Sequence, residues 1–407
     1  RPFFLGAAIY SAIAMGIWFG AYALGVTPPG VARYGSLWHA HEMIFGYSAA
    51  VIAGFLLTAA RNWTGLPTLE RGPLALLFAL WLGARIAFCV ESLSLVAPAL
   101  DATFNLMLIY AVARPIIKVR QWRQLGILTK LVLLGVGNVL FFLGAWNIVD
   151  NGMRLAVVAA VYVIIGLVLT MARRLIPFFT ERGVGQALTL RNSSALDGLC
   201  LAAFLAFFIL EVFTQQQRVA GWLAALLCAL HALRLTMWYT PAILARPLLW
   251  SLHLSYGLMV LAFALQAAAA FGWAPATLAL HMFALGGIGL ITISMMVRVS
   301  IGHTGRDVHA PPAQVKVVLA LTLASVVARV LLPLVLPTQY FALVVAAQLL
   351  WIASFALLAW LLWPGGGAPA WVALFVALEN GLIYTAQVLL PLGFNDGATI
   401  LHWWGRR

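Results

Sequence analysis

Twelve long apolar runs divide this chain, and each is long enough to cross a lipid bilayer as a helix. Hydrophobic residues make up 64% of the 407 residues and charged residues 9%, a proportion that a water-soluble fold cannot bury. The sequence therefore predicts an all-α, polytopic bundle of transmembrane helices. The expected spans are residues 3–26, 41–60, 73–91, 98–117, 125–147, 153–177, 195–213, 219–240, 248–272, 276–300, 314–336 and 340–363.

The C-terminal part of the chain differs from the rest. A Pro-Gly-Gly-Gly linker at 364–367 ends the twelfth run, and a thirteenth helix is expected over 370–391. The tail after it contains Trp403, whose indole suits the membrane interface. We therefore expect a transmembrane domain over 1–363, followed over 364–407 by a linker, an extra helix and an interfacial tail.

The net charge of +13 is concentrated in alternate connections between the spans, which indicates a cytoplasmic N-terminus. With this orientation, only Arg33, Arg154 and Arg218 lie in outer connections, and the connection from Arg173 to Ser194 is the longest polar one inside. No zinc-finger spacing or RNA-binding motif accompanies the charge, so nucleic acid is not an expected partner. The inner connections contain Arg61, Arg71, Arg114, Lys118, Arg120, Arg123, Arg173, Arg174, Arg182, Arg191, Arg246, Arg306 and Lys316.

The second span opens with Trp-His-Ala-His-Glu-Met at 38–43, which places two imidazoles and a carboxylate at the mouth of an apolar run. Neutral imidazole is a metal ligand that a nearby carboxylate can orient, so a metal or haem site is one interpretation. Residues two apart on a helix point about 200° away from each other, so only one of His39 and His41 can face a given ion. In the alternative interpretation, one or both histidines are interfacial residues in contact with water at the helix end.

A third histidine, His281, lies near the outer end of the tenth span, at the level of His39 and His41. Glycines within 286–289 follow it and leave room for a macrocycle or for a closely packed helix. The alternative is a packing helix whose histidine bonds a neighbouring residue.

Two further histidines lie at the cytoplasmic level. His253 comes one helical turn before Tyr256, and an imidazole with a phenol could serve a redox or proton-transfer site or form a hydrogen-bonded pair at the interface. His303 is roughly 33 Å along the helix from His281, so these two cannot share a metal. His303 either joins His253 in an inner metal site or caps its own helix. His231 is expected in a polar packing patch.

Charged residues inside the spans need partners, because an unpaired charge is costly at that depth. Arg85 and Arg329 both fall in the outer half, as do Glu42 and Glu91. Structural ion pairing explains the arginines in one interpretation. In the other, an arginine neutralises haem propionates, since a guanidinium makes paired contacts with carboxylates.

A set of short motifs follows one order along the chain. They are Arg1-Pro2-Phe3-Phe4-Leu5, Trp38-His39-Ala40-His41-Glu42-Met43, Ile52-Ala53-Gly54-Phe55-Leu56-Leu57-Thr58-Ala59, Asn62-Trp63-Thr64-Gly65, Ala113-Arg114-Pro115, Gln121-Trp122-Arg123, Trp250-Ser251-Leu252-His253-Leu254-Ser255-Tyr256, Leu280-His281 and Arg298-Val299-Ser300-Ile301-Gly302-His303-Thr304-Gly305-Arg306. Together they resemble, over roughly residues 1–363, the NnrS family of haem- and copper-containing membrane proteins associated with nitric oxide.

The resemblance implies a twelve-helix protein of the bacterial cytoplasmic membrane that contains haem b, with copper as a further metal. It also implies nitric oxide as ligand or substrate and an electron donor of unknown identity. We expect His41 and His281 as the preferred haem ligands, with His39 next. The cofactor-binding candidates are His39, His41, His253, His281, Arg85 and Arg329, and the metal-binding candidates are His39, His41, His253, His281 and His303.

The expected function is binding of nitric oxide, or its turnover by an oxidoreductase, in nitrosative-stress defence. A metal-ion transporter that uses the membrane histidines is the alternative. That alternative predicts an internal repeat with interrupted helices, and the two halves of the sequence show no convincing repeat. A membrane sensor or assembly factor is a third possibility, for which the sequence shows no signalling domain.

Overall fold

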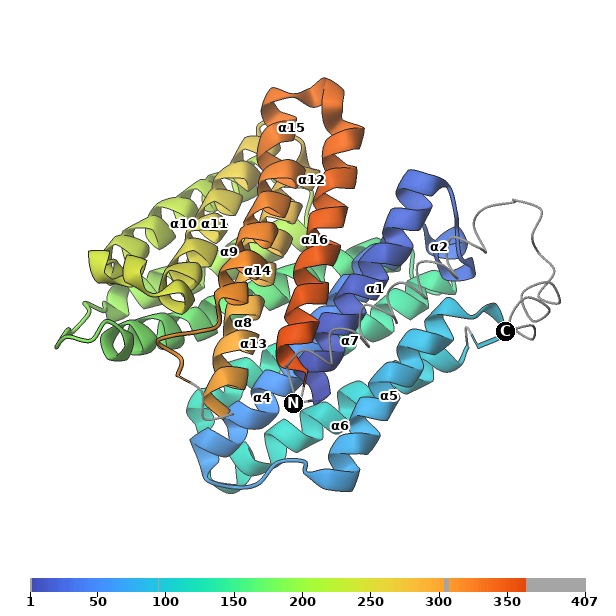
Figure 1. The fold of residues 1–407 in the computed structure, drawn as a ribbon. Helices are drawn as coiled ribbons and strands as arrows, with labels where there is room; N and C mark the ends of the chain where they lie inside the picture. Colours follow the sequence, from blue (N-terminus) through green and yellow to red (C-terminus); the bar gives the residue numbers. More distant parts are fainter. Residues whose placement is uncertain (1, 94, 304–306, 364–407) are drawn as a thin grey trace, which may run out of the picture.

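The fold is that of a computed structural model of the chain, which describes residues 2–93, 95–303 and 307–363 (Figure 1). Helices supply the regular structure of these residues, and no strand occurs among them. The expected thirteenth helix over 370–391 and the interfacial tail lie outside the described residues.

Twelve helical segments of the described chain are long and apolar enough to cross a membrane, which confirms the expected fold class and number of spans. The cytoplasmic position of the N-terminus stays a prediction. The spans are α1 (Pro2–Leu24), α3 (Ser36–His41) with η1 (Glu42–Ser48) and α4 (Ala49–Thr64), α5 (Arg71–Cys89), α6 (Val96–Lys118), η3 (Trp122–Gln124) with α7 (Leu125–Ala145), α8 (Gly152–Gly183), α9 (Ser194–Phe213), α10 (Gln217–Trp238), α11 (Pro247–Ala270), α12 (Ala276–His281) with η5 (Met282–Gly289) and α13 (Leu290–His303), α14 (Ala313–Val326) with η6 (Val327–Leu331) and α15 (Leu332–Val335), and η7 (Pro337–Gln339) with α16 (Tyr340–Leu362). The connections contain α2 (Pro29–Tyr34), η2 (Glu91–Leu93) and η4 (Pro241–Ala245).

The sixth span is longer than expected, because α8 continues through Pro177 to Gly183. The expected span, taken from the apolar run alone, was 153–177, and a proline at its end removes one backbone N–H from the helix. Instead, the last turns of α8 bury Ile176 and Thr180, and a Cβ at position 183 would lie 2.9 Å from Leu249. Packing of this face compensates for the lost hydrogen bond, so the polar loop begins only after Gly183.

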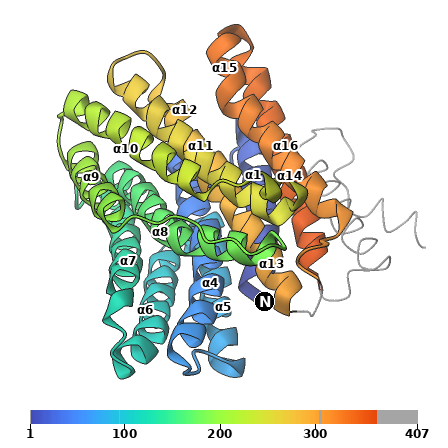
Figure 2. The same cartoon turned by 90° about the vertical axis from the view of Figure 1, so that its left-hand side faces the viewer.

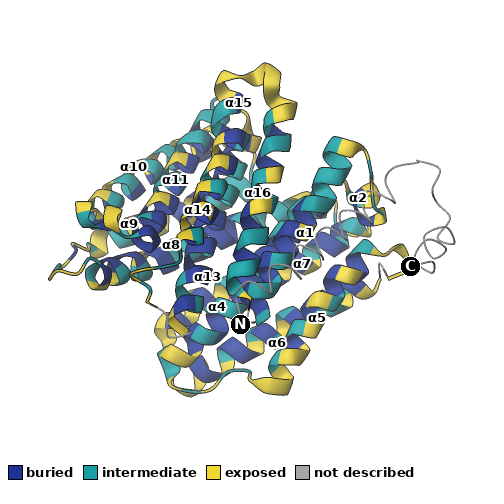
Figure 3. Ribbon diagram, in the orientation of Figure 1, coloured by how far each residue is buried: buried dark blue, intermediate teal, exposed yellow. Residues whose placement is uncertain are grey.

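Neighbouring spans pack side by side as hairpins, most extensively α7 with α8, α10 with α11 and α14 with α16 (Figures 1 and 2). The first and last described spans also meet: α1 lies along α16, and Trp351 donates a hydrogen bond of 2.9 Å to Ser11. The second and tenth spans are the most buried of the twelve (Figure 3). Because these two spans carry His39, His41 and His281, the histidines lie within the bundle.

Gly144 tests the close packing of α7 on α8. A Cβ at this position would clash with the backbone of Met153, whereas a Cβ at Gly20 in α1 would meet nothing within 4 Å. We expect Gly144→Ala to lower the free energy of unfolding by about 1–3 kcal/mol through overpacking. The control Gly20→Ala should be neutral or slightly stabilising, because alanine favours a helix. Thermal unfolding in detergent measures both, and equal effects would contradict the close packing.

Candidate cofactor site

Three spans contain a π-helical segment: η1 in the second, η5 in the tenth and η6 in the eleventh. Such segments are rare and occur frequently at functional sites. η1 begins directly after His41, η5 begins directly after His281, and η6 contains Arg329. The polar residues singled out from the sequence therefore coincide with the irregular parts of the helices.

His39, His281 and Arg329 come together from three different spans. The charge of Arg329 acts on both imidazoles, and the two imidazoles also interact electrostatically with each other. The helix α12, which ends at His281, packs against η6, which contains Arg329. The structure thus brings together three of the residues expected to bind a cofactor.

Each of these two histidines has a ring nitrogen that no hydrogen bond among the described residues uses. His281 Nδ1 donates to the carbonyl oxygen of Thr277 at 2.7 Å, so Nε2 presents its lone pair. His39 stacks on Trp18 with ring centroids 5.2 Å apart and an interplanar angle of 13°, and its buried Nδ1 is unbonded. The hydrogen bond of His281 is the kind that metal-binding histidines make with their second ring nitrogen, which fixes the ring and its tautomer.

Arg329 has no carboxylate partner in the described part of the chain. Its Nη1 is buried and unbonded there, and its guanidinium carbon lies 5.5 Å from the centroid of the Tyr340 ring. The aromatic contact offsets only part of the cost of placing this charge inside the bundle. A carboxylate from a bound molecule would complete its pairing.

His41 points away from His39, as helix geometry predicts, and both of its ring nitrogens have protein partners. Nδ1 lies 2.7 Å from Glu42 Oε1, and Nε2 lies 3.3 Å from Asn138 Nδ2. The structure therefore places His41, one of the two preferred ligands, in a closed polar cluster. Four aromatic rings surround its imidazole at centroid distances of 4.4 to 5.3 Å: Phe45, Phe88, Phe141 and Phe142.

Arg85 is the centre of this cluster. It donates to Glu42 Oε1 at 2.6 Å and also to Asp101, and the Tyr10 hydroxyl donates to Glu42. The three charged side chains are at most 1% exposed. Arg85 thus makes the structural ion pairs that were one interpretation of the sequence, and this separates it from Arg329. Asp101 was missed, although a carboxylate inside a predicted span is itself a sign of a buried partner.

The inner histidine and phenol do not pair as the sequence suggested. Tyr256 bonds His231, with 2.6 Å between the hydroxyl and Nδ1, so the expected pairing with His253 is wrong. His253 instead places its nitrogens 3.0 and 3.2 Å from the carbonyl oxygens of Leu249 and Trp238. The reason is that Tyr256 faces α10, whose His231 is a closer partner than a residue on its own helix.

His231 lies in the polar packing patch expected for it. Arg234 donates to Asp197 at 2.8 Å and reaches the Tyr256 hydroxyl at 3.4 Å. The last metal candidate, His303, is the exposed end of α13. Over residues 2–93, 95–303 and 307–363, no group of three or more His, Cys, Asp or Glu side chains is arranged to hold a metal ion.

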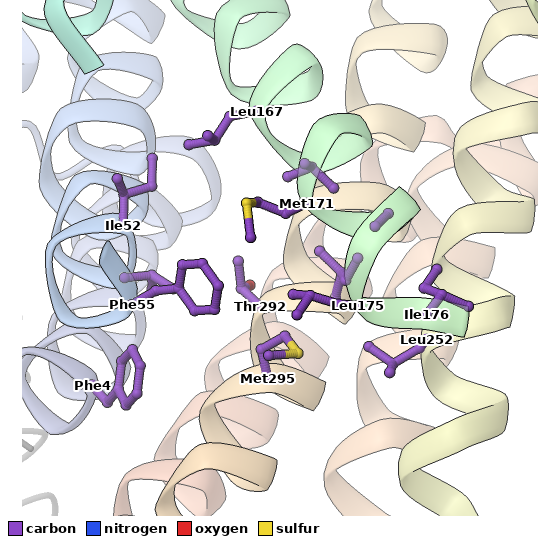
Figure 4. A pocket seen from close by; sticks show the side chains of 14 residues that line it. Phe4, Ile52, Phe55, Leu167, Met171, Leu175, Ile176, Leu252, Thr292 and Met295 are labelled. Carbon is purple, nitrogen blue, oxygen red and sulfur yellow. The ribbon is translucent and has the colours of Figure 1, made fainter. Parts of the chain in front are cut away.

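A cavity of about 80 Å³ lies between α1, α4, α8, α11 and α13 (Figure 4). Its lining is apolar: the Thr292 hydroxyl bonds Tyr47 and carbonyls of its own helix, so Thr292 leaves no free polar group in the wall. Met171 and Met295 are among the lining residues. Thr292 is roughly 16 Å along the helix from His281, so the cavity is separate from the histidines. Such a space suits a small apolar molecule.

The family model described as NnrS protein matches residues 1–365. This range includes all twelve spans and every candidate histidine and arginine. No curated protein matches the chain.

Replacing Arg85 should destabilise the protein strongly. Arg85→Gln leaves Glu42 and Asp101 buried without their cation, which costs about 3–5 kcal/mol for a buried pair. The control Arg61→Gln breaks an exposed pair with Glu70, where we expect at most about 1 kcal/mol. Denaturant unfolding in detergent compares the two variants. If they lose the same stability, the buried cluster does not have the role described here.

Proposed function

Because this chain belongs to the NnrS family, we propose that it is a haem b protein of the bacterial cytoplasmic membrane that binds or reduces nitric oxide in nitrosative-stress defence. The observation that carries the proposal is the convergence of His39, His281 and Arg329 within the bundle. Each has a polar group without a partner among the described residues, at a depth where such groups are costly. A haem would satisfy all three, through its iron and its propionates.

The two imidazoles are suited to hold iron in different ways. The hydrogen bond from His281 Nδ1 to Thr277 fixes the tautomer and makes Nε2 a better donor. The ring of His39 is held by stacking on Trp18, which leaves Nδ1 unbonded. Arg329 would pair with a propionate, for which its guanidinium geometry is suited. This assignment prefers His39 to His41, because both nitrogens of His41 are engaged.

Haem iron binds nitric oxide, and an electron donor decides whether the bound gas is also reduced. The contribution of the protein is an apolar surrounding and a fixed position for each ligand. Nitric oxide is small and apolar, so it can enter through the bilayer without a polar channel. The apolar cavity beside Thr292 is in keeping with such a ligand.

Only membership of the family suggests copper. His41, His253 and His303 are the candidates that remain as copper ligands. A metal at His41 or His253 would have to displace contacts that each imidazole makes with protein atoms. Measuring iron and copper per chain in the purified protein decides whether a second metal is present.

Replacing either proposed ligand should change the absorption spectrum. The purified protein should show a Soret band that shifts on reduction with dithionite and again with nitric oxide. His281→Ala and His39→Ala should each shift this band or lower the haem content. His309→Ala, on an exposed turn, should match the wild type. A colourless wild-type protein would contradict the proposal and favour the metal-ion transporter.

Arg329→Gln tests the propionate contact. Loss of the cation should weaken haem retention and lower the reduction potential, because a nearby positive charge favours the reduced iron. The control Arg298→Gln removes a cation from the other end of the tenth span, where Arg298 lies over Phe179 and donates to Leu248. A redox titration followed by absorbance measures both variants. An unchanged potential and haem content in Arg329→Gln would exclude the contact.

A further inference from the structure

Four cations gather where α7 begins and α8 approaches its end: Arg123, Lys130, Arg173 and Arg174. The three arginines lie at or near the end of the bundle, whereas Lys130 lies roughly 8 Å along α7 from the first residue of that helix. Figure 2 shows α7, α8 and α9 beside one another here, and α8 packs on both of the others. The cluster therefore extends from the end of the bundle into the depth of the hydrocarbon layer.

The cations are held close together by contacts with the backbone and with one amide. Arg174 donates to Gln124 Oε1 at 2.6 Å and to the carbonyl oxygen of Arg123 at 3.3 Å. Lys130 donates to the carbonyl oxygen of Gly126 at 3.0 Å. The charge of Arg174 repels Lys130, and the charges of Arg123 and Arg173 repel Arg174. This arrangement places four like charges together, with Arg123 and Arg173 exposed and Lys130 and Arg174 partly buried.

The nearby carboxylate, that of Asp197, pairs with only one of the four cations. Asp197 on α9 pairs with Arg173 at 2.5 Å and with Arg234 at 2.8 Å. In the part of the chain that the structure describes, no carboxylate forms an ion pair with Arg123, Lys130 or Arg174. An anion among these three would relieve their repulsion and pair with each of them.

The surface of α7 beside the cluster is apolar and faces outward. Trp122, which is 54% exposed, lies at the level of the arginines, as an interfacial aromatic residue does. Gly166 on α8 lets the stem of Lys130 lie close to the helix, since a Cβ there would come 3.4 Å from Lys130 Cε. The exposed apolar side chains along the outer side of α7 are Leu125, Val132, Leu133 and Val136, of which Leu133 lies one helical turn from Lys130.

We propose that this cluster binds the phosphate of an anionic phospholipid. The phosphate contacts Lys130, Arg174 and Arg123, and the acyl chains lie along the exposed apolar side of α7. Basic pockets between membrane helices recognise lipid headgroups in this way. The depth of Lys130 and the adjoining apolar surface favour a lipid over a free phosphate ion, which would gain nothing from that surface.

Native mass spectrometry of the full chain, titrated separately with phosphatidylglycerol and phosphatidylcholine, tests the proposal. We expect tighter binding of phosphatidylglycerol, weakened about fivefold or more by Lys130→Gln and by Arg174→Gln. Lys316→Gln is the matched control, because it removes an exposed cation at the start of α14, away from this cluster. Lys130→Arg keeps the charge and should retain most of the binding, which guards against a merely structural effect.

Several outcomes would overturn the proposal. Equal weakening by Lys316→Gln would indicate diffuse attraction of anionic lipid to the whole basic face. Displacement of the lipid by millimolar inorganic phosphate would indicate a phosphate-ion site. Equal affinity for phosphatidylcholine, or wild-type binding by both Gln variants, would show that the cluster does not select an anionic headgroup. None of these results depends on haem or on nitric oxide.

Discussion

Polar groups inside a bilayer must find their partners within the protein, because the hydrocarbon offers none. Arg85 meets most of this requirement: Nη1 and Nη2 donate to Glu42 and Asp101, while Nε has no hydrogen-bond partner among the described residues, and Tyr10 and His41 also bond Glu42. The second, third and fourth spans are joined at this point. The same requirement applies to every polar group in the rest of the bundle. A buried polar group without a protein partner indicates a place where a bound molecule would supply one.

His39 and Arg329 are two of the residues with a buried polar atom that lacks a partner among the described residues, and His281 beside them leaves Nε2 unbonded. Their neighbours Trp18, Thr277 and Tyr340 hold the side chains in place without using the ring nitrogens or the guanidinium fully. The π-helical segments η1, η5 and η6 beside them add a second sign, since such segments are rare and occur frequently at functional sites. A site that is ready to bind a molecule needs side chains that are held in place but keep a polar group without a protein partner.

The spans could be predicted from the sequence because hydrophobic length is a local property, and the histidine levels followed from the position of each residue in its span. The partners could not be predicted, since they depend on how helices rotate against one another. Asp101 and Asn138, which complete the cluster around His41, come from spans whose facing sides no local pattern reveals. The same limitation explains why Tyr256 was assigned to His253 rather than to His231.

The central proposal is that His39 and His281 each keep one ring nitrogen free of protein partners because that nitrogen binds haem iron. The most direct test is the number of haem molecules per chain, measured by the pyridine haemochrome method in the wild-type protein and in the double variant His39→Ala/His281→Ala. The account predicts haem b in the wild type and its loss in a double variant that still folds as a twelve-span bundle. A wild type without haem, or a double variant that retains the full amount, would contradict it.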